Sequence, residues 1–538
     1  MQSLVIEKFE ANPMEESAVG RGTVSLSVAS IVQVVAGTGY FIILTNLLHS
    51  TLTVGVVTSL NILIWFFVVV CVLAEPVVYV SPIPAPLAVL KFVPEFLAKN
   101  ERNGAVRVFR ASLILTLILS LAVAGILITM PSIVIPFFGE AIPPDYICLS
   151  AIDILLLSVG QVCLGVVIAL GDTQVATVYI VAWSVVRYAM ASILLWSFSV
   201  VGVLSGWILG DFLLLLLVLR RTLQSLGWQV GVSASSFSAK DLTRYNLYTL
   251  FATLIGFVIS QADRLITLSQ QGLSRLAIYN VAMLGAGVAN IAPYALINVL
   301  LPAAAAIFAS NRMNELHDLV RSYTRYVSLF VMPAAFSLAA VMEIPLRIFG
   351  PDYVGGLLPA IIVSVATGLT SLGVIYAGLL LALGKMRWFT AANLLGLVAL
   401  FVVAGTLTSV LGLNGPALGR ASLMAVSAIV FALATFKIKI FEIDFRAFII
   451  SVVSSTIMMI VIFSILSVLR ELILKLVMLP VLLIVGVLVY VVSLRAFHGL
   501  MVSDMDFLRG LLPCRLHSIL PMLARLAGLE YDLSKNDQ

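Results

Sequence analysis

The sequence predicts an all-α polytopic membrane protein with about fourteen transmembrane helices, and two observations predict it. Of the 538 residues, 61% are hydrophobic and only 11% are charged, whereas a soluble globular chain is roughly 45–50% apolar and about 25% charged. Apolar runs long enough to cross a bilayer core, which needs about 20 residues per helix, follow one another along most of the chain. A soluble fold would lack the polar residues to cover its surface.

The apolar runs give the predicted spans in chain order. They cover residues 23–47, 53–79, 107–130, 146–170, 174–199, 202–219, 245–267, 277–301, 323–345, 358–384, 388–411, 415–436, 446–469 and 475–494. Met1 to Arg21 contains four glutamates and lacks the cationic flank of a cleaved signal peptide. We therefore expect the first span to remain in the membrane.

The distribution of Lys and Arg predicts the orientation. If the N-terminus is cytoplasmic, 24 of the 31 Lys and Arg residues fall in cytoplasmic segments, as the positive-inside rule requires. We therefore expect a multi-pass protein of the cell membrane with both termini in the cytoplasm. Topology explains the net charge of +5, and a nucleic-acid partner is not expected.

Three pairs of short motifs indicate an internal repeat. The pairs are Gly165–Gly171 with Gly378–Gly384, Gly206–Asp211 with Gly415–Arg420, and Phe138-Gly139 with Phe349-Gly350, and the offset between the two members is similar in all three. Six spans separate the members of each pair, so the second half enters the membrane in the same direction as the first. The predicted fold is two six-helix lobes related by a parallel repeat, followed by two additional helices.

These boundaries define the predicted domains. They are a cytoplasmic N-terminal segment (1–22), an N-lobe of helices 1–6 (23–220), a cytoplasmic linker (221–244), a C-lobe of helices 7–12 (245–440), additional helices 13 and 14 (441–496), and a cytoplasmic amphipathic tail (497–538).

Ionisable residues inside spans are costly and usually face a cavity or a partner. Here they are Glu75, Asp153, Arg187, Asp211, Asp263, Arg264 and Arg420. The match of Gly206–Asp211 with Gly415–Arg420 places Asp211 and Arg420 at equivalent positions with opposite charge, which favours a charge pair across a cleft between the lobes. Alternatively, Asp211 pairs with Arg187, which lies at a similar depth in the neighbouring helix. The residue pattern leaves both pairings open.

Polar residues also recur at helical spacing in four spans. They are Gln33, Gly37 and Tyr40 in the first; Asn61 and Glu75 in the second; Thr249, Thr253, Gly256, Ser260 and Asp263 in the seventh; and Gly287, Asn290, Tyr294 and Asn298 in the eighth. Packing between helices explains any one of these residues. A shared polar cavity explains the four stripes together.

No motif of enzyme chemistry stands out. The sequence has no Gly-rich phosphate loop and no G-x-S-x-G. The four cysteines and four histidines lie singly, without metal-ligand spacing. We therefore expect a protein that is not an enzyme and has no cofactor or metal. A membrane-embedded glycosyltransferase or ligase would need a catalytic loop, and the loops are short.

The order of several motifs resembles a known family. The motifs are Asp263-Arg264-Leu265, Leu276–Ala282, Leu301-Pro302, Ile348–Tyr353, Leu381–Lys385 and Gly412–Ala417. Together they resemble the polysaccharide-biosynthesis flippases of the multidrug/oligosaccharidyl-lipid/polysaccharide (MOP) superfamily. The resemblance implies two six-helix lobes around a central cavity and alternating access that carries a polyprenyl-linked oligosaccharide outward. It also implies that the two additional helices can form a groove for the lipid tail.

The expected function is therefore a flippase for a polyprenyl-(di)phosphate-linked oligosaccharide. Its expected partners are this substrate, membrane lipids and enzymes of glycan assembly. The candidate substrate-binding residues are Arg187, Arg264, Arg420, Asp211, Asp263, Gln33, Tyr40, Asn61, Asn290, Tyr294 and Asn298, and the candidates for ion coupling are Glu75, Asp153 and Asp263. A multidrug or organic-cation antiporter of the same superfamily is the main alternative.

Overall fold

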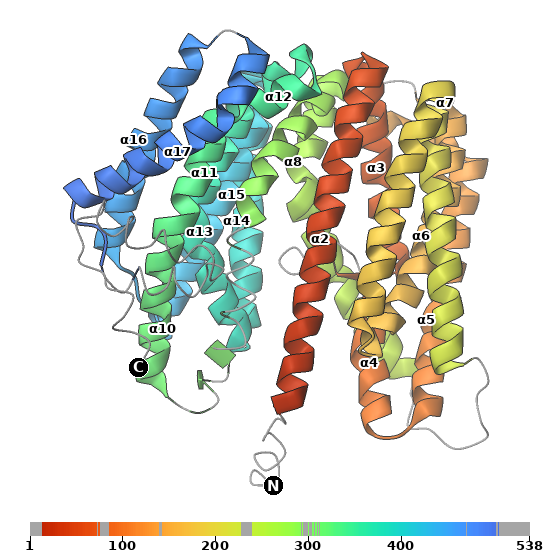
Figure 1. Ribbon diagram of the computed structural model, residues 1–538. Helices are drawn as coiled ribbons and strands as arrows, with labels where there is room; N and C mark the ends of the chain where they lie inside the picture. Colours follow the sequence, from red (N-terminus) through yellow and green to blue (C-terminus); the bar gives the residue numbers. More distant parts are fainter. Residues whose placement is uncertain are drawn as a thin grey trace. The chain divides into compact units, whose positions relative to one another are not determined.

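The computed structural model describes residues 13–72, 74–75, 85–138, 142–227, 239–291, 293, 300, 304–305, 307–308, 310, 312–469, 471–501 and 504. Their structure is almost entirely helical (Figure 1). Eleven helical segments are long and apolar enough to cross a membrane, and Val32–Leu48 is a shorter apolar helix. The all-α multi-pass membrane fold is confirmed.

The elements up to the middle of the chain are as follows. They are α2 (Pro13–Leu48), α3 (Thr51–Val72), β1 (Ala74–Glu75), β2 (Ala85–Pro86), α4 (Leu87–Ala98), α5 (Arg102–Thr129), the 3₁₀ turns Pro131–Ile133 and Ile135–Phe138, α6 (Pro144–Ala169), α7 (Thr173–Leu226), α8 (Ala239–Gly287) and the 3₁₀ turn Val288–Asn290.

The remaining elements follow a similar plan. They are α10 (Met313–Tyr326), a π-helical segment (Val327–Val331), α11 (Met332–Val341), α12 (Glu343–Phe349), the 3₁₀ segment Pro351–Gly356, α13 (Leu357–Ala382), α14 (Met386–Leu411), α15 (Asn414–Lys437), α16 (Phe445–Val468) and α17 (Leu472–Ala496).

Two long elements each contain two predicted spans. α7 turns at Ser199, whose φ of 52° and ψ of −133° are not helical, and this turn separates the predicted fifth and sixth spans. α8 turns at Gly272, with φ 79° and ψ −179°, between the predicted seventh and eighth spans. Each element is therefore a hairpin of two membrane helices with a very tight connection.

The second span is shorter than predicted. α3 ends at Val72, and Glu75 lies in the two-residue strand β1, which pairs antiparallel with β2. The prediction that Asn61 and Glu75 share one helix face is therefore wrong. The physical reason is Pro76, because a proline disfavours the helical conformation of the residue before it. The side chain of Glu75 lies outside the described residues.

The chain divides into two compact units, Met1–Ala277 (unit 1) and Ile278–Gln538 (unit 2). Within unit 1, α6 packs against α5 and α7, and α7 also packs against α2. Within unit 2, α15 packs against α13 and α14, and α16 packs against α11 and α17. The unit boundary lies inside α8, so residues 245–267 group with unit 1; the predicted lobe boundaries stay a prediction.

The helix pattern of unit 1 recurs in unit 2 at a constant offset along the chain. We refer to the offset that takes Gly171 to Gly384 as the repeat offset. α6 and α13 both have 26 residues, and they begin and end at this offset. α7 and α14 begin at the same offset. Gly171 with φ 82° and Gly384 with φ 66° both end the preceding helix in the left-handed region. The predicted repeat is therefore present in the backbone.

The turns of the two equivalent hairpins match closely. Ser199 has φ 52° and ψ −133°, and Gly412, its equivalent at the repeat offset, has φ 57° and ψ −131°. These angles are those of the first central residue of a type II′ turn, a position that favours glycine because φ is positive. The same turn therefore joins the two helices in both units.

The helices of each hairpin touch at equivalent residues. A Cβ atom at Gly206 would lie 2.3 Å from the backbone nitrogen of Ala191, and one at Gly419 would lie 2.6 Å from the Cβ of Ala404. The repeat offset takes Gly206 to Gly419 and Ala191 to Ala404. Close approach of two helix backbones through small residues is typical of membrane helices.

The repeat offset corrects one prediction of the sequence analysis. At this offset the equivalent of Asp211 is Met424, and the equivalent of Arg420 is Trp207. The match of Gly206 with Gly415 is one helical turn out of register. α7 has a glycine at every fourth position, including Gly206, so a shift by one turn aligns glycines equally well. Asp211 and Arg420 are not equivalent residues.

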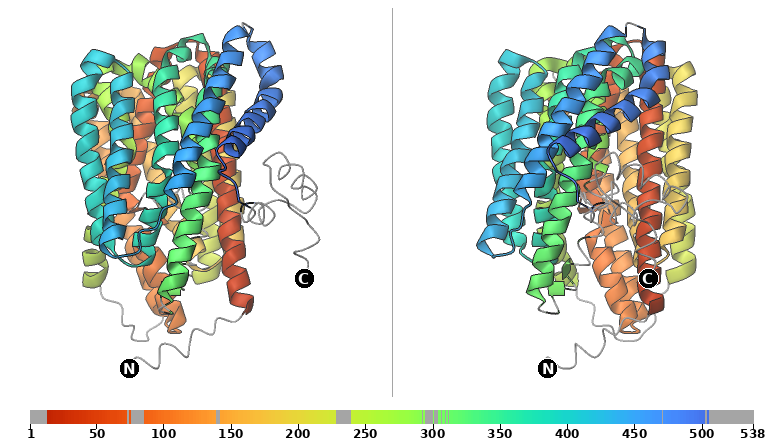
Figure 2. Two further views of the ribbon diagram at one scale, coloured as in Figure 1. Left: turned by 90° about the vertical axis from the view of Figure 1, so that its left-hand side faces the viewer. Right: turned by 60° about the vertical axis from the view of Figure 1, so that its left-hand side comes forward.

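The additional helices α16 and α17 lie against α11 (Figure 2). Tyr490 on α17 donates a hydrogen bond to the carbonyl oxygen of Leu329 (2.9 Å), and Ser451 on α16 donates one to the carbonyl oxygen of Ser328. Both carbonyls belong to the π-helical segment, where the regular i to i−4 hydrogen bonds are interrupted. At the start of α17, Lys475 forms an ion pair with Glu343 (2.8 Å). These contacts join the additional helices to the rest of unit 2.

Candidate buried charge cluster in unit 1

Three charged side chains meet inside unit 1, and we refer to Asp153, Arg187 and Asp211 as the Arg187 cluster. Arg187 donates one hydrogen bond from Nη1 to Oδ2 of Asp211 and another from Nη2 to Oδ2 of Asp153 (3.1 Å). The two carboxylates are fully buried, and Arg187 is only 2% exposed. Of the two pairings that the sequence left open, Asp211 therefore pairs with Arg187.

Aromatic side chains surround the cluster. The indole nitrogen of Trp183 donates a hydrogen bond to Oδ1 of Asp211 (2.6 Å). The guanidinium carbon of Arg187 lies 5.1 Å from the ring centre of Trp207 and 5.7 Å from that of Trp183, within the range of cation–π attraction. These rings keep the guanidinium away from water and lipid.

Local sequence brings these groups together. Asp153 lies on α6, while Arg187 and Asp211 lie on the two helices of the α7 hairpin. Gly210 lets the hairpin close at this level, because a Cβ atom there would lie 2.6 Å from the Cα of Arg187. The acidic residue next to this glycine therefore reaches the guanidinium of the facing helix.

The cluster has an excess of negative charge. With both carboxylates ionised, two negative charges face one guanidinium, which leaves a formal charge of −1. Oδ1 of Asp153 is buried and has no hydrogen-bond partner among the described residues. An uncompensated buried charge is costly, so a carboxylate in such a place tends to take up a proton or a cation.

Three further predicted residues lie on α2 and α3. Tyr40, on α2, is 2% exposed and stacks on Tyr188 at 5.1 Å between ring centres, with an interplanar angle of 21°. Gln33 is half-buried, and its side-chain oxygen has no partner in the part of the chain that the structure describes. Asn61 on α3 is half-buried. The structure thus places Tyr40, but not every predicted residue, among the aromatic side chains around the Arg187 cluster.

The predicted residues of α8 have separate surroundings. Asp263 is fully buried, and its backbone carbonyl accepts a hydrogen bond from Thr267 (2.7 Å). Arg264 is half-buried and donates to the carbonyl oxygen of Ser260 (3.2 Å) and to Oε1 of Gln261 (3.3 Å). These bonds are local to the helix.

The other predicted positions are partly described. Asn290 is half-buried in a 3₁₀ turn, and Arg420 is half-buried on α15. Tyr294 and Asn298 lie outside the described residues, as does the side chain of Thr249. Within the described residues, no group of three or more His, Cys, Asp and Glu side chains could hold a metal ion.

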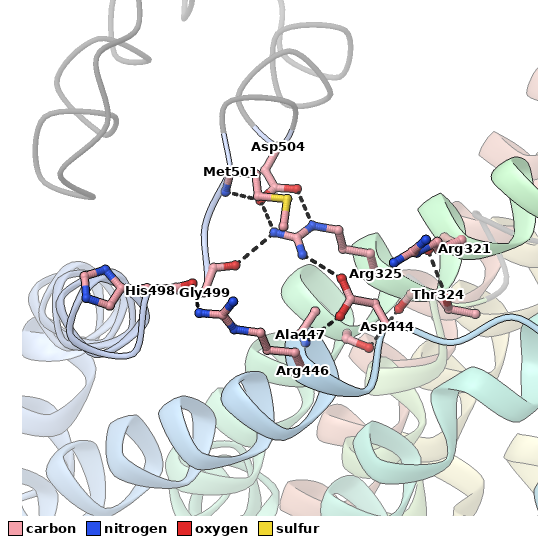
Figure 3. Close-up of polar contacts among 11 residues, drawn as sticks. Arg321, Thr324, Arg325, Asp444, Arg446, Ala447, His498, Gly499, Met501 and Asp504 are labelled. Carbon is pink, nitrogen blue, oxygen red and sulfur yellow. Dashed lines mark hydrogen bonds and ion pairs between the residues drawn. The ribbon is translucent and has the colours of Figure 1, made fainter.

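Sequence reasoning missed a second charge cluster, which lies in unit 2 (Figure 3). Arg325 donates hydrogen bonds to Asp504 (2.7 and 2.8 Å), to Asp444 (2.7 Å) and to the carbonyl oxygen of Gly499 (2.9 Å). We refer to these four residues as the Arg325 cluster. By charge distribution alone, Arg325 counts only among the cytoplasmic cations. The signal that could have found it is its place inside the predicted span 323–345, because an ionisable residue within a span is costly and needs a partner.

Comparison with known proteins gives the family context. Residues 99–352 match the model of a family described as polysaccharide biosynthesis protein. No curated protein sequence matches the chain significantly.

Solved structures match over most of their length. The lipid II flippase MurJ in an inward closed conformation has a TM-score of 0.64 and 13% identity, covering 88% of this chain and 99% of that chain. An inward-facing multidrug resistance MATE family transporter has a TM-score of 0.60 and 16% identity, covering 78% and 98%. A MOP superfamily transporter from Pyrococcus furiosus, described by a reverse polarity of its binding pocket, has a TM-score of 0.52 and 15% identity, covering 78% and 95%.

The chain has the fold of the MOP superfamily. At these identities the structural similarity establishes the fold, and residues 99–352 are similar to the polysaccharide-biosynthesis family. The resemblance predicted from the order of motifs is therefore confirmed. The MOP structures named above are flippases and transporters rather than enzymes.

Proposed function

We propose that the protein is a MOP transporter that flips a polyprenyl-(di)phosphate-linked oligosaccharide from the cytoplasmic to the outer leaflet by alternating access. The observation that carries the proposal is the polysaccharide-biosynthesis match over residues 99–352, on a chain with the MOP fold. Similarity to a lipid II flippase supports a lipid-linked substrate. The protein would act in the cell membrane, with both termini cytoplasmic, beside enzymes of glycan assembly.

The anionic (di)phosphate of this substrate requires a cation. Arg264 and Arg420 are the better candidates because both are half-buried, whereas Arg187 is enclosed by two carboxylates and two indoles. A guanidinium offers a planar fork that matches phosphate oxygens. An inside-negative potential favours outward movement of negative charge by about 2.3 kcal/mol per charge per 100 mV.

The Arg187 cluster is the better candidate for coupling to an ion. Its formal charge of −1 and the unpartnered Oδ1 of Asp153 favour uptake of a proton or sodium ion, which would change the attraction between α6 and the α7 hairpin. We therefore assign Arg187 a positioning role and Asp153 the coupling role. Asp263, another coupling candidate, lies on α8 and not on the helices that form the Arg187 cluster.

An organic-cation antiporter is the second candidate, and the same cluster favours it. Such a transporter needs acidic residues in its binding site, and Arg187 by itself argues against one. Since Arg187 is neutralised by Asp211, the cluster as a whole is acidic. The similarity to a multidrug resistance MATE family transporter supports this candidate as well.

The test uses purified protein in vesicles that contain a polyprenyl-diphosphate oligosaccharide with a fluorescent sugar. A membrane-impermeant quencher added outside reports the fraction of label in the outer leaflet. We expect the protein to raise this fraction above that of protein-free vesicles. Arg420→Ala should slow the exchange, while Arg387→Ala, which removes an exposed arginine of the same unit, should not.

Two further results decide between the candidates. If the protein moves a fluorescent organic cation along a pH gradient but leaves the glycolipid in place, the flippase proposal is wrong and the antiporter stands. If glycolipid moves equally well in Arg420→Ala, only the role of Arg420 is wrong. Asp153→Asn should abolish the dependence of transport on a pH or sodium gradient while the vesicles remain sealed.

A further inference from the structure

An open pocket of ≈ 360 Å³ lies at the end of the α7 hairpin opposite the Ser199 turn. Its walls come from the first turns of one helix and the last turns of the other, and they consist of Val175, Tyr179, Leu217, Arg220, Arg221 and Gln224. This end of the hairpin also contacts the basic start of α5, since Arg102 donates to the carbonyl oxygen of Ser225 (2.9 Å). The pocket therefore belongs to the Lys- and Arg-rich end of unit 1.

The pocket has positive charge that the described residues do not neutralise. Arg221 pairs with Asp172 (2.6 Å), which cancels one charge, but the Nε of Arg221 is buried without a hydrogen-bond partner in the described structure. Arg220 is exposed and forms no ion pair with any described residue. One net positive charge therefore lines the space.

The pocket walls are amphipathic in a definite direction. Tyr179 and Leu217 lie nearer the Ser199 turn, while Arg220, Arg221 and Gln224 lie level with Val175, where the apolar run of the second α7 helix has ended. The arginines are thus placed where hydrocarbon gives way to the headgroup layer, the depth at which lipid phosphates lie. Basic pockets between membrane helices at this depth hold anionic headgroups.

The equivalent end of the second hairpin shows that the fold does not require this pocket. At the repeat offset, Tyr179 corresponds to Ala392 and Arg221 to Ala434, and both alanines are fully buried. Val175 corresponds to Trp388, which packs against the hydrophobic core there. In unit 2 the Trp388 ring takes the place of Val175, with the ammonium of Lys437 5.2 Å from its centre, whereas in unit 1 an open space is kept.

We propose that this pocket binds the phosphate group of an anionic membrane lipid in the leaflet at the basic end of unit 1. Arg220 and the exposed part of the Arg221 guanidinium attract the phosphate, Gln224 offers a further polar contact, and Tyr179 and Leu217 adjoin the first carbons of the acyl chains. The bound lipid bridges the two helices of the hairpin at the end opposite the Ser199 turn.

The test measures lipid binding by native mass spectrometry and by thermal melting of the full-length protein in detergent. Phosphatidylglycerol, phosphatidylcholine and inorganic phosphate are added separately. We expect the wild-type protein to retain and be stabilised by phosphatidylglycerol more than by the other two. A basic residue near anionic lipid contributes about 1 kcal/mol, so Arg220→Gln should weaken phosphatidylglycerol binding about fivefold.

A second variant separates the pocket from its charge. Val175→Trp introduces the residue found at the equivalent position of unit 2 and fills the space without removing an arginine, so it should abolish retention, whereas Arg220→Gln only weakens it. Arg387→Gln is the matched control and should bind as the wild type does. Gel filtration and far-UV circular dichroism verify that each variant is folded.

Two outcomes would overturn the proposal. Equal retention of phosphatidylglycerol by wild type, Arg220→Gln and Val175→Trp would show that the lipid binds elsewhere. Stabilisation by inorganic phosphate as strong as that by phosphatidylglycerol would show a site for a free anion rather than for a lipid. Neither outcome depends on whether the protein transports a glycan.

Discussion

The α7 hairpin of unit 1 and the α14–α15 hairpin of unit 2 have the same backbone and different interiors. Their turns share φ and ψ within a few degrees, and their glycines meet the facing helix at equivalent residues. The residues equivalent to Asp153, Arg187 and Asp211 are Ala366, Leu400 and Met424. The hairpin fold therefore does not require the charge cluster.

The largest expected effect comes from breaking the cluster. Arg187→Leu leaves two buried carboxylates without their cation and should lower the free energy of unfolding by about 3–5 kcal/mol. Thermal melting in detergent measures the loss.

The matched control converts the whole cluster to its unit 2 counterpart. Asp153→Ala, Arg187→Leu and Asp211→Met together should restore most of the lost stability, because replacing a complete buried ion group with apolar residues is often neutral. If the triple variant is stable but inactive in the vesicle assay, the charges serve transport. If it is as unstable as Arg187→Leu, the comparison between the hairpins fails.

The second effect tests the shared helix contact. Gly206→Val and Gly419→Val should each destabilise their own hairpin by about 1–3 kcal/mol, because the added side chain overlaps the facing helix. The Gly206 variant should lose more, since its Cβ meets backbone nitrogen while that of Gly419 meets a methyl group. Gly125→Val, whose Cβ meets nothing within 4 Å, should melt as the wild type does.

The third effect concerns the turns. Ser199→Gly should stabilise the protein by about 1 kcal/mol, because serine is strained at a positive φ where Gly412 is not. Gly412→Ser should destabilise by a similar amount. Ser197→Gly, inside the preceding helix, should lower the melting temperature instead. If Ser197→Gly raised it, the stabilisation by Ser199→Gly could not be attributed to the turn.

The smallest effect tests a contact of the Arg325 cluster in unit 2. Burial alone would raise the pKa of Asp444, but hydrogen bonds from the Ala447 amide and the Arg325 guanidinium outweigh it and hold the pKa below its ordinary value of 3.8. Because the folded-state pKa is the lower one, the stabilisation is present above pH 3.8 and is lost as the pH falls through the folded-state pKa.

Asp444→Asn keeps an acceptor for the Ala447 amide but removes the charge that pairs with Arg325, so it should cost about 1 kcal/mol at neutral pH. The difference from wild type should shrink in melting curves recorded at decreasing pH. A difference for Asp444→Asn that stays constant with pH would exclude the charge as its origin.

Most of the helices could be predicted because a membrane leaves few alternatives. Without water to satisfy backbone groups, an apolar run of sufficient length must be helical, and small residues mark where such helices meet. The boundaries were less certain. α3 ends before Pro76, and the span predicted over residues 323–345 begins earlier, at Met313, because α10 is helical although it is polar, with His317, Asp318 and Arg321.

The sequence by itself determined the membrane fold, the parallel repeat and the short set of charged residues inside the spans, because each depends on composition or periodicity. Only the tertiary structure decided the register of that repeat, since a glycine at every fourth position makes a slip of one turn invisible in the sequence. It also decided that Arg187 faces Asp153 and Asp211, and that Arg325 holds Asp444 and Asp504. Such pairings depend on which helix faces meet, and residue spacing along one helix carries no information about its neighbour.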